Sequence, residues 1–213
     1  MVFNSIGRKP YSNLSFYIGD RTLEVVGSFK YLGFIISNDL SDSNDIDRTR
    51  NKFYQEFNVI LRKFSFANIR VKLYLFTQFC LQFYGAELWF NNKYSTASLK
   101  QFGIGYHKAI KKILGLSYHE SNHFACQESN LYTFEHLINK IKILFVLRLI
   151  YKPCNFIKRN SSYFNVSSVK YREVMDVLQS KYNIDSITDN DKEAIIARIG
   201  FVQNHEPQSR EAL

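Results

Sequence analysis

The alternation of apolar and polar positions predicts that the chain begins with β-structure. Between residues 13 and 36, apolar side chains alternate with polar or smaller ones, as in strands with one buried face. Gly19-Asp20 is a turn signal, Leu23 to Val26 could form the return strand, and Phe29 to Ile36 is a further β-rich run. We expect a sheet of about three strands, too small to bury a core without the helices that follow.

After a polar loop at residues 38–47, the pattern changes to helical spacing. Ser43, Asn44 and Asp45 are candidate N-caps for the first helix, at residues 46–64. Its apolar residues fall on one stripe: Phe53, Phe57, Ile60, Leu61 and Phe64.

Three more helices are predicted, at Ile69–Trp89, Thr96–Leu114 and Phe134–Tyr151. The helix at Ile69–Trp89 is apolar nearly all round, so we expect it to be the most buried element. Gly115 is placed to end the next helix, and Pro153 follows the last. Residues 167–182 and 189–200 carry weaker helical patterns.

Composition supports a mainly α protein with a small N-terminal antiparallel β-sheet, an α+β fold. Hydrophobic residues make up 46% of the chain, and only 9 Gly and 3 Pro interrupt it. We expect a β-rich region at residues 1–40, a helical region at 41–155, and a C-terminal helical segment with a polar tail at 156–213.

Charge changes the functional expectation, because the chain has a net charge of +9 and a pI of about 9.4. Counted along the sequence, residues 48–112 hold 12 Lys/Arg against 2 Asp/Glu, whereas residues 173–213 hold 4 against 8. A basic surface favours a polyanionic partner such as RNA or DNA, because binding releases condensed counterions. The alternative is a protein with scattered, solvated lysines.

The cations fall into two groups. The first group contains Arg48, Arg50, Lys52, Arg62, Lys63, Arg70 and Lys72. In the second, Lys108, Lys111 and Lys112 share one side of a helix beside Tyr106 and His107, and cations beside aromatic rings suit single-stranded nucleic acid. For each lysine, a solvated helix face is the competing interpretation.

Few other features suggest chemistry. His119, His123, Cys126 and His136 lack the tight Cys/His pairs of structural zinc sites, so no metal or other cofactor is predicted. Three widely spaced cysteines are not a disulfide framework and fit a reducing compartment. The N-terminal residues do not resemble a signal peptide, and no apolar run reaches the roughly 18 residues needed to span a bilayer. An intracellular protein, cytoplasmic or nuclear, is expected, with no membrane partner.

Four segments together resemble a known family: Met1-Val2-Phe3, Phe29 to Phe34 with its Tyr-Leu-Gly, Phe83 to Trp89, and Tyr106 to Gly115. In this order and spacing they are similar to the region that follows the catalytic core of non-LTR (LINE-type) retrotransposon reverse transcriptases. The similarity covers about residues 1–115 and extends faintly to about 150.

The resemblance implies that Tyr31, Leu32 and Gly33 form a primer grip at the end of the palm. It also implies that the following helices form a thumb-like bundle whose cations track the template-primer backbone without reading sequence. Gly33 would permit a tight turn or a close backbone approach. The competing interpretation is an ordinary strand and bend.

The family polymerizes DNA with Mg²⁺ held by paired aspartates. This sequence contains no Asp-Asp pair. No catalytic residue is therefore carried over, and we expect no polymerase activity from this chain alone.

Two other functions stay open. The chain could be a protein-interaction module, because Phe76, Phe79, Phe83 and Trp89 are many aromatics beside so small a sheet. It could also be a decayed transposon reading frame without a function.

Overall fold

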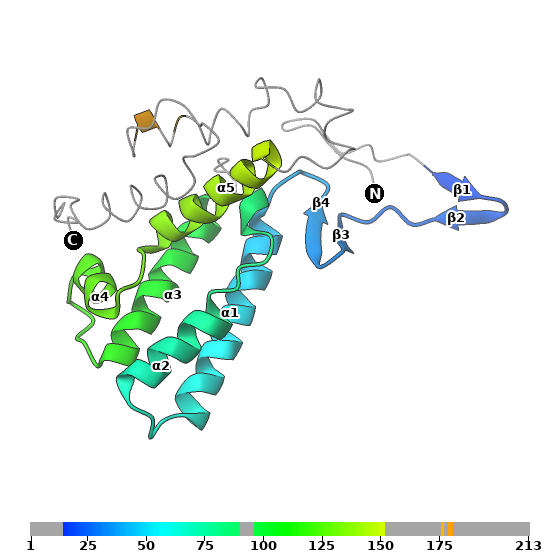
Figure 1. Cartoon of the computed structure of the whole chain (residues 1–213). Helices are drawn as coiled ribbons and strands as arrows, with labels where there is room; N and C mark the ends of the chain where they lie inside the picture. Colours follow the sequence, from blue (N-terminus) through cyan, green and yellow to red (C-terminus); the bar gives the residue numbers. More distant parts are fainter. Residues whose placement is uncertain (1–14, 90–95, 152–175, 177–178, 181–213) are drawn as a thin grey trace. The chain divides into compact units, whose positions relative to one another are not determined.

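The computed structural model describes residues 15–89 and 96–151, together with Asp176, Gln179 and Ser180, which are helical (Figure 1). The fold is mainly α with β-hairpins at the start, as predicted. The strands are β1 (Phe16–Ile18), β2 (Arg21–Leu23), β3 (Ser28–Tyr31) and β4 (Phe34–Ser37). The helices are α1 (Ser43–Lys63), α2 (Ile69–Leu75), η1 (Phe76–Cys80), η2 (Ala86–Leu88), α3 (Thr96–Leu114), α4 (Asn122–Ser129) and α5 (Phe134–Tyr151).

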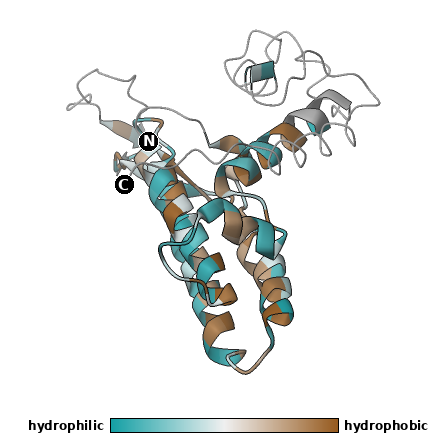
Figure 2. Ribbon diagram, turned by 90° about the vertical axis from the view of Figure 1, so that its left-hand side faces the viewer, coloured by the Kyte–Doolittle hydropathy of each residue, from teal (hydrophilic) through white to brown (hydrophobic). Residues whose placement is uncertain are grey.

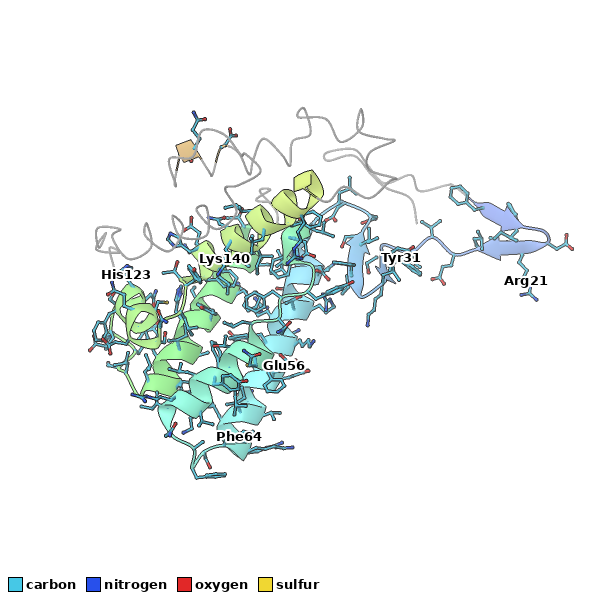
Figure 3. All side chains as sticks on the ribbon, in the orientation of Figure 1. Arg21, Tyr31, Glu56, Phe64, His123 and Lys140 are labelled. Carbon is cyan, nitrogen blue, oxygen red and sulfur yellow. The ribbon has the colours of Figure 1, made fainter. Side chains whose placement is uncertain are left out.

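The strands form two separate antiparallel hairpins, so the prediction of one sheet of about three strands is wrong. β1 pairs with β2 around the predicted Gly19-Asp20 turn, and β3 pairs with β4. The run from Phe29 to Ile36 is broken because Leu32 and Gly33 both have positive φ, of 47° and 90°. A two-residue loop with two positive φ angles reverses the chain as a type I′ turn. Arg21 lies on the first hairpin and Tyr31 on the second (Figure 3).

The first helix, α1, begins before the predicted caps. Asp42 is the N-cap, and its side chain makes no capping hydrogen bond, whereas Ser43, Asn44 and Asp45 already lie within the helix. The predicted apolar stripe is largely confirmed, because Phe53, Phe57 and Ile60 are buried. Polar and apolar residues alternate around the helix ribbons (Figure 2), as expected when one face is buried.

The helix predicted over Ile69–Trp89 is wrong in both extent and burial. It is interrupted by the wider π-turn η1, by a non-helical segment at residues 81–85 and by the 3₁₀ turn η2. No residue of α2 is buried. Gly85, the last residue of the non-helical segment, has a φ of 95°, a conformation that L side chains rarely take.

The predicted bounds of α3 and α5 are confirmed. Gly115 has a φ of 69°, and the Leu116 amide donates to the Lys111 carbonyl at 2.9 Å, which is a glycine-terminated helix end. The short helix α4 was not predicted. Of the described helices, none has the length and apolar character needed to cross a membrane. The helical patterns at 167–182 and 189–200, and the C-terminal segment at 156–213, lie outside the described residues apart from the three named above.

The chain divides into two compact units that take alternating stretches of sequence. The first contains Met1–Phe66, Tyr74–Gly85 and Trp89–Phe102, and the second contains Ala67–Leu73, Ala86–Leu88 and Gly103–Leu213. The expected boundary at residue 40 falls inside the first unit.

The core of the first unit is a cluster of aromatic rings around Phe53. The ring centre of Phe53 lies 5.8 Å from that of Phe76, 6.2 Å from that of Phe83 and 5.4 Å from that of Phe102. Edge-to-face pairs of this kind stabilise a core beyond simple area burial. The segment predicted as a single helix therefore supplies buried rings from η1 and from the irregular stretch after it.

The second unit has a core between α3, α4 and α5. Tyr106 is fully buried and donates from its hydroxyl to the Tyr132 carbonyl at 2.6 Å. Gly103 lets Phe134 approach, because a Cβ at Gly103 would stand 3.1 Å from the Phe134 ring. Cys126 from α4 and Ile138 from α5 complete the apolar interior.

Candidate nucleic-acid interface

The tip of the β3–β4 hairpin is held by Tyr84. The Tyr84 hydroxyl donates to the Leu32 carbonyl at 3.3 Å, and the Phe34 and Tyr84 ring centres lie 4.8 Å apart. A Cβ at Gly33 would stand 3.2 Å from the Tyr84 ring. The expectation that Gly33 allows a tight turn and a close approach is therefore confirmed. Tyr31 and Leu32 remain exposed at the tip.

Asp45 fixes the same hairpin from the side of α1. Its carboxylate accepts from the Ile35 amide at 3.1 Å, from the Arg48 Nε at 2.8 Å and from the Trp89 indole at 3.0 Å. The residue is only 4% exposed. A buried carboxylate with three donors, one of them charged, is well satisfied.

Asp45 and Tyr84 thus bring together two sequence segments that look unrelated in the linear order. Phe29 to Phe34 and Phe83 to Trp89 are separated by about fifty residues, yet they meet in the first unit. Gly85 belongs to the same contact, because a Cβ there would stand 2.4 Å from the Phe34 ring. Sequence reasoning gave Asp45 the role of a cap. The available signal was one of three acidic residues at positions 42–47 before the apolar stripe, Asp42, Asp45 and Asp47, and the sequence does not show which of them is buried or what it binds.

Three predicted cations on α1 are neutralised by carboxylates of the same helix. Arg48 pairs with Asp45, Arg50 lies 3.2 Å from Asp47, and Lys52 lies 3.6 Å from Glu56. Arg50 also donates to the Gln101 side chain at 2.7 Å. These side chains have local partners, which reduces the charge they offer to an external anion.

Four of the remaining predicted cations are exposed and form no ion pair in the described residues. They are Arg62, Lys63, Arg70 and Lys112. Lys72 is half-buried. The exposed side chains come from the end of α1, from α2 and from α3.

The three lysines of α3 do not share one solvent-facing side. Lys108 and Lys112 are exposed, whereas Lys111 is 8% exposed. The Lys111 ammonium donates to the Tyr118 carbonyl at 3.1 Å and lies 5.7 Å from the centre of the Tyr118 ring. Lys111 therefore holds the turn after α3.

Tyr106 and His107, predicted to lie beside these lysines as accessible aromatics, face the protein instead. Tyr106 is fully buried, and burial raises the pKa of its hydroxyl well above the usual value. Burial, and after it the nearby charge of Lys111, lower the pKa of His107 to about 4. The exposed aromatic of this region is Tyr118, which the sequence did not single out.

The cysteines and histidines do not gather into a ligand set. Burial raises the pKa of the Cys80 thiol and of the Cys126 thiol to about 12, so both are poor nucleophiles. His119 is exposed, and His136 is buried with its Nδ1 2.7 Å from the Thr133 hydroxyl. In the part of the chain that the structure describes, no three His, Cys, Asp or Glu residues are placed to hold a metal ion. His123 lies on α4 and Lys140 on α5 (Figure 3).

The aromatics that suggested an interaction module are mostly core. Phe76, Phe83 and Trp89 are buried, and only Phe79 is exposed. Exposed apolar side chains occur along the whole described chain, with Phe66 at 87%, and seven of them lie on the two hairpins. These seven are Phe16, Tyr17, Ile18, Leu23, Phe29, Tyr31 and Leu32.

Comparisons with known proteins gave no match to a family model, to a curated protein or to a solved structure.

Proposed function

We propose that this chain is a reverse transcriptase-like protein that binds RNA or DNA without sequence preference and does not polymerize by itself. The observation that carries the proposal is the set of exposed cations without carboxylate partners in the described residues, which includes Arg62, Lys63, Arg70 and Lys112. Such side chains can neutralise phosphates, and a phosphate contact positions the nucleic acid without reading its bases.

The hairpin tip gives separate support for a grip-like role. Leu32 has a φ of 47° and is 72% exposed. A leucine in the left-handed region costs about 1–2 kcal/mol. Strain of this kind is often retained where a backbone must be presented to a ligand. The Tyr84 hydroxyl donates to Leu32 and the Asp45 carboxylate accepts from Ile35, so the hairpin is anchored to the first unit.

The absence of polymerase activity is part of the proposal and rests on the sequence. The resemblance places the metal-binding aspartates in an adjacent pair, and the sequence of this chain contains no such pair. A primer-extension assay with the purified chain, Mg²⁺ and nucleotides should give no product. Extension of the primer would overturn this part.

The binding proposal is tested with a labelled RNA–DNA primer-template at several salt concentrations. We expect the logarithm of the affinity to fall linearly with the logarithm of the salt concentration, with a slope of roughly 0.9 for each phosphate contacted. The affinity should be the same for a second duplex of unrelated sequence. A folded protein that fails to bind at low salt, or whose affinity ignores salt, would overturn the proposal.

A second candidate function is docking to a protein through the hairpins. The observation that favours it is the exposure of apolar side chains such as Tyr17, Ile18 and Leu32, at 66%, 68% and 72%. Apolar surface of this kind marks interaction sites when it is contiguous. Self-association or partner binding that strengthens with salt would favour this function over nucleic-acid binding.

A further inference from the structure

The turn after α3 presents one aromatic ring to solvent. Gly115 ends the helix with positive φ, and the chain then folds back over the last helical turn. Several hydrogen bonds fix the turn: among them, the Lys111 ammonium donates to the Tyr118 carbonyl at 3.1 Å, and the Glu120 amide donates to the Ser117 carbonyl at 3.2 Å. Tyr118 is held by its backbone while 66% of its surface stays exposed.

Two lysine ammonium groups lie near this ring. The Lys108 ammonium lies 5.2 Å from the ring centre and the Lys111 ammonium 5.7 Å from it. Lys112 is exposed one helical turn after Lys108, on the same side of α3. An ammonium at such a distance is attracted to the π face and helps to orient the ring. Glu120 is the one carboxylate of the turn at residues 115–120.

An exposed tyrosine beside several lysines matches the chemistry of an unpaired nucleotide. The ring offers a face on which any base can stack, and the lysines offer positive charge to the phosphates on either side. A duplex does not offer the same contact, because its base faces are already covered by neighbouring base pairs. An acidic protein segment would use the lysines but would leave the ring without a stacking partner.

We propose that Tyr118 is a stacking platform for a base of single-stranded nucleic acid, with Lys108 and Lys112 contacting the adjacent phosphates. This inference rests on the proposed nucleic-acid binding and adds to it a preference for unpaired strands. His119, whose ring lies 5.7 Å from that of Tyr118 edge to face, supports the platform from one side.

The test compares a labelled oligothymidylate with a labelled DNA duplex, using fluorescence anisotropy at several salt concentrations. The proteins are the unaltered chain, Tyr118→Ala, Tyr118→Phe and Tyr17→Ala. Tyr17 is the matched control because it is also 66% exposed but has no lysine ammonium over its ring in the described residues.

We expect Tyr118→Ala to weaken single-strand binding by about 5- to 150-fold, the range for one lost stacking contact. The salt slope should not change, because no cation is removed, and duplex affinity should change by less than about twofold. Tyr118→Phe and Tyr17→Ala should bind the single strand as the unaltered chain does.

The outcomes separate the two proposals. If Tyr118→Ala binds the single strand with unchanged affinity and a normal salt slope, the platform is overturned and the proposed binding function stands. If Tyr118→Ala weakens duplex binding equally, the ring makes no stacking contact specific to unpaired bases, and the inference is also wrong. If the folded, unaltered chain binds neither probe at low salt, both proposals fail.

Discussion

The cations in the first part of α1 and those of α3 differ in the groups that they contact. On α1, Arg48, Arg50 and Lys52 lie within an ion-pair distance of carboxylates on the same helix. On α3, Lys108 and Lys111 lie over the ring of Tyr118, and no carboxylate pairs with them in the described residues.

This difference teaches that the count of lysines and arginines in a stretch is a poor guide to its available charge. Arg48 serves the fold, because it balances a carboxylate that also holds β4 and Trp89. Lys111 serves the fold in another way, by tying down a turn. Lys108 and Lys112 are exposed, so basic side chains have three different uses along residues 48–112.

The largest expected effect comes from removing the carboxylate at the centre of the α1 arrangement. Asp45→Asn should lower the free energy of unfolding by about 3–5 kcal/mol, because Arg48 loses its counter-charge and the Ile35 amide and Trp89 indole compete for one acceptor. Guanidinium titration followed by the fluorescence of Trp89, the single tryptophan, measures this directly.

Asp47→Asn is the matched control on the same helix. The Asp47 side chain is 41% exposed and pairs with Arg50, so its loss should cost less than about 1 kcal/mol. If Asp45→Asn and Asp47→Asn lower the free energy of unfolding equally, Asp45 does not organise the first unit.

A smaller effect on stability is expected from the protonation of His107 on α3. Burial first, and then Lys111, hold the pKa of His107 near 4, and its Nε2 accepts from the Phe134 amide at 3.4 Å. The unfolded chain takes up this proton at about pH 6.5, before the folded chain does. Stability from this group is therefore complete above about pH 6.5 and is lost as pH falls toward 4, by at most about 3 kcal/mol.

His107→Gln should remove this contribution. Chemical unfolding of both proteins between about pH 7 and about pH 5 should show a shallower loss of stability in the variant. If the two proteins lose stability in parallel, His107 is protonated as easily in the folded chain as in the unfolded one, and its burial does not have the effect described.

The smallest expected effect compares the two sets of cations directly in binding. Lys108→Gln with Lys112→Gln should reduce the salt slope of nucleic-acid binding by roughly 2, since each phosphate contact contributes roughly 0.9. Arg50→Gln with Lys52→Gln removes the same formal charge from α1. It should leave the slope nearly unchanged, because those cations already have carboxylate partners.

Equal decreases in slope for the two pairs would mean that the total charge decides binding and that the ion pairs of α1 do not matter. If only the Arg50 and Lys52 double variant has a smaller salt slope, the phosphate contacts lie on α1 and not on α3.

Some elements could be predicted from local pattern because local pattern is sufficient to form them. The end of α3 at Leu114 followed from a glycine placed after a helical repeat, and the Gly19-Asp20 turn followed from two turn-forming residues. Gly33 was expected to allow a close approach, and Tyr84 is the residue that approaches. In each case the backbone conformation depends on the preferences of a few neighbouring residues, whereas the contact of Gly33 with Tyr84 joins distant parts of the sequence.

The segment from Ile69 to Trp89 shows where this reasoning fails. Its apolar residues fit a buried helix, but the buried rings of Phe76 and Phe83 pack around Phe53, about twenty to thirty residues earlier. Packing of those rings, together with the positive φ of Gly85, outweighs the helical preference of the segment.

The sequence by itself determined the fold class, the bounds of the helices at Thr96–Leu114 and Phe134–Tyr151, and the basic charge. Only the tertiary structure decided that Asp45 is a buried acceptor for three donors, that Lys111 is committed to a turn, and that Tyr118 is the exposed ring beside the lysines. The physical reason is that helix formation depends on neighbours three or four residues apart. Which charge is neutralised, and which ring stays exposed, depends on contacts that only the folded chain creates.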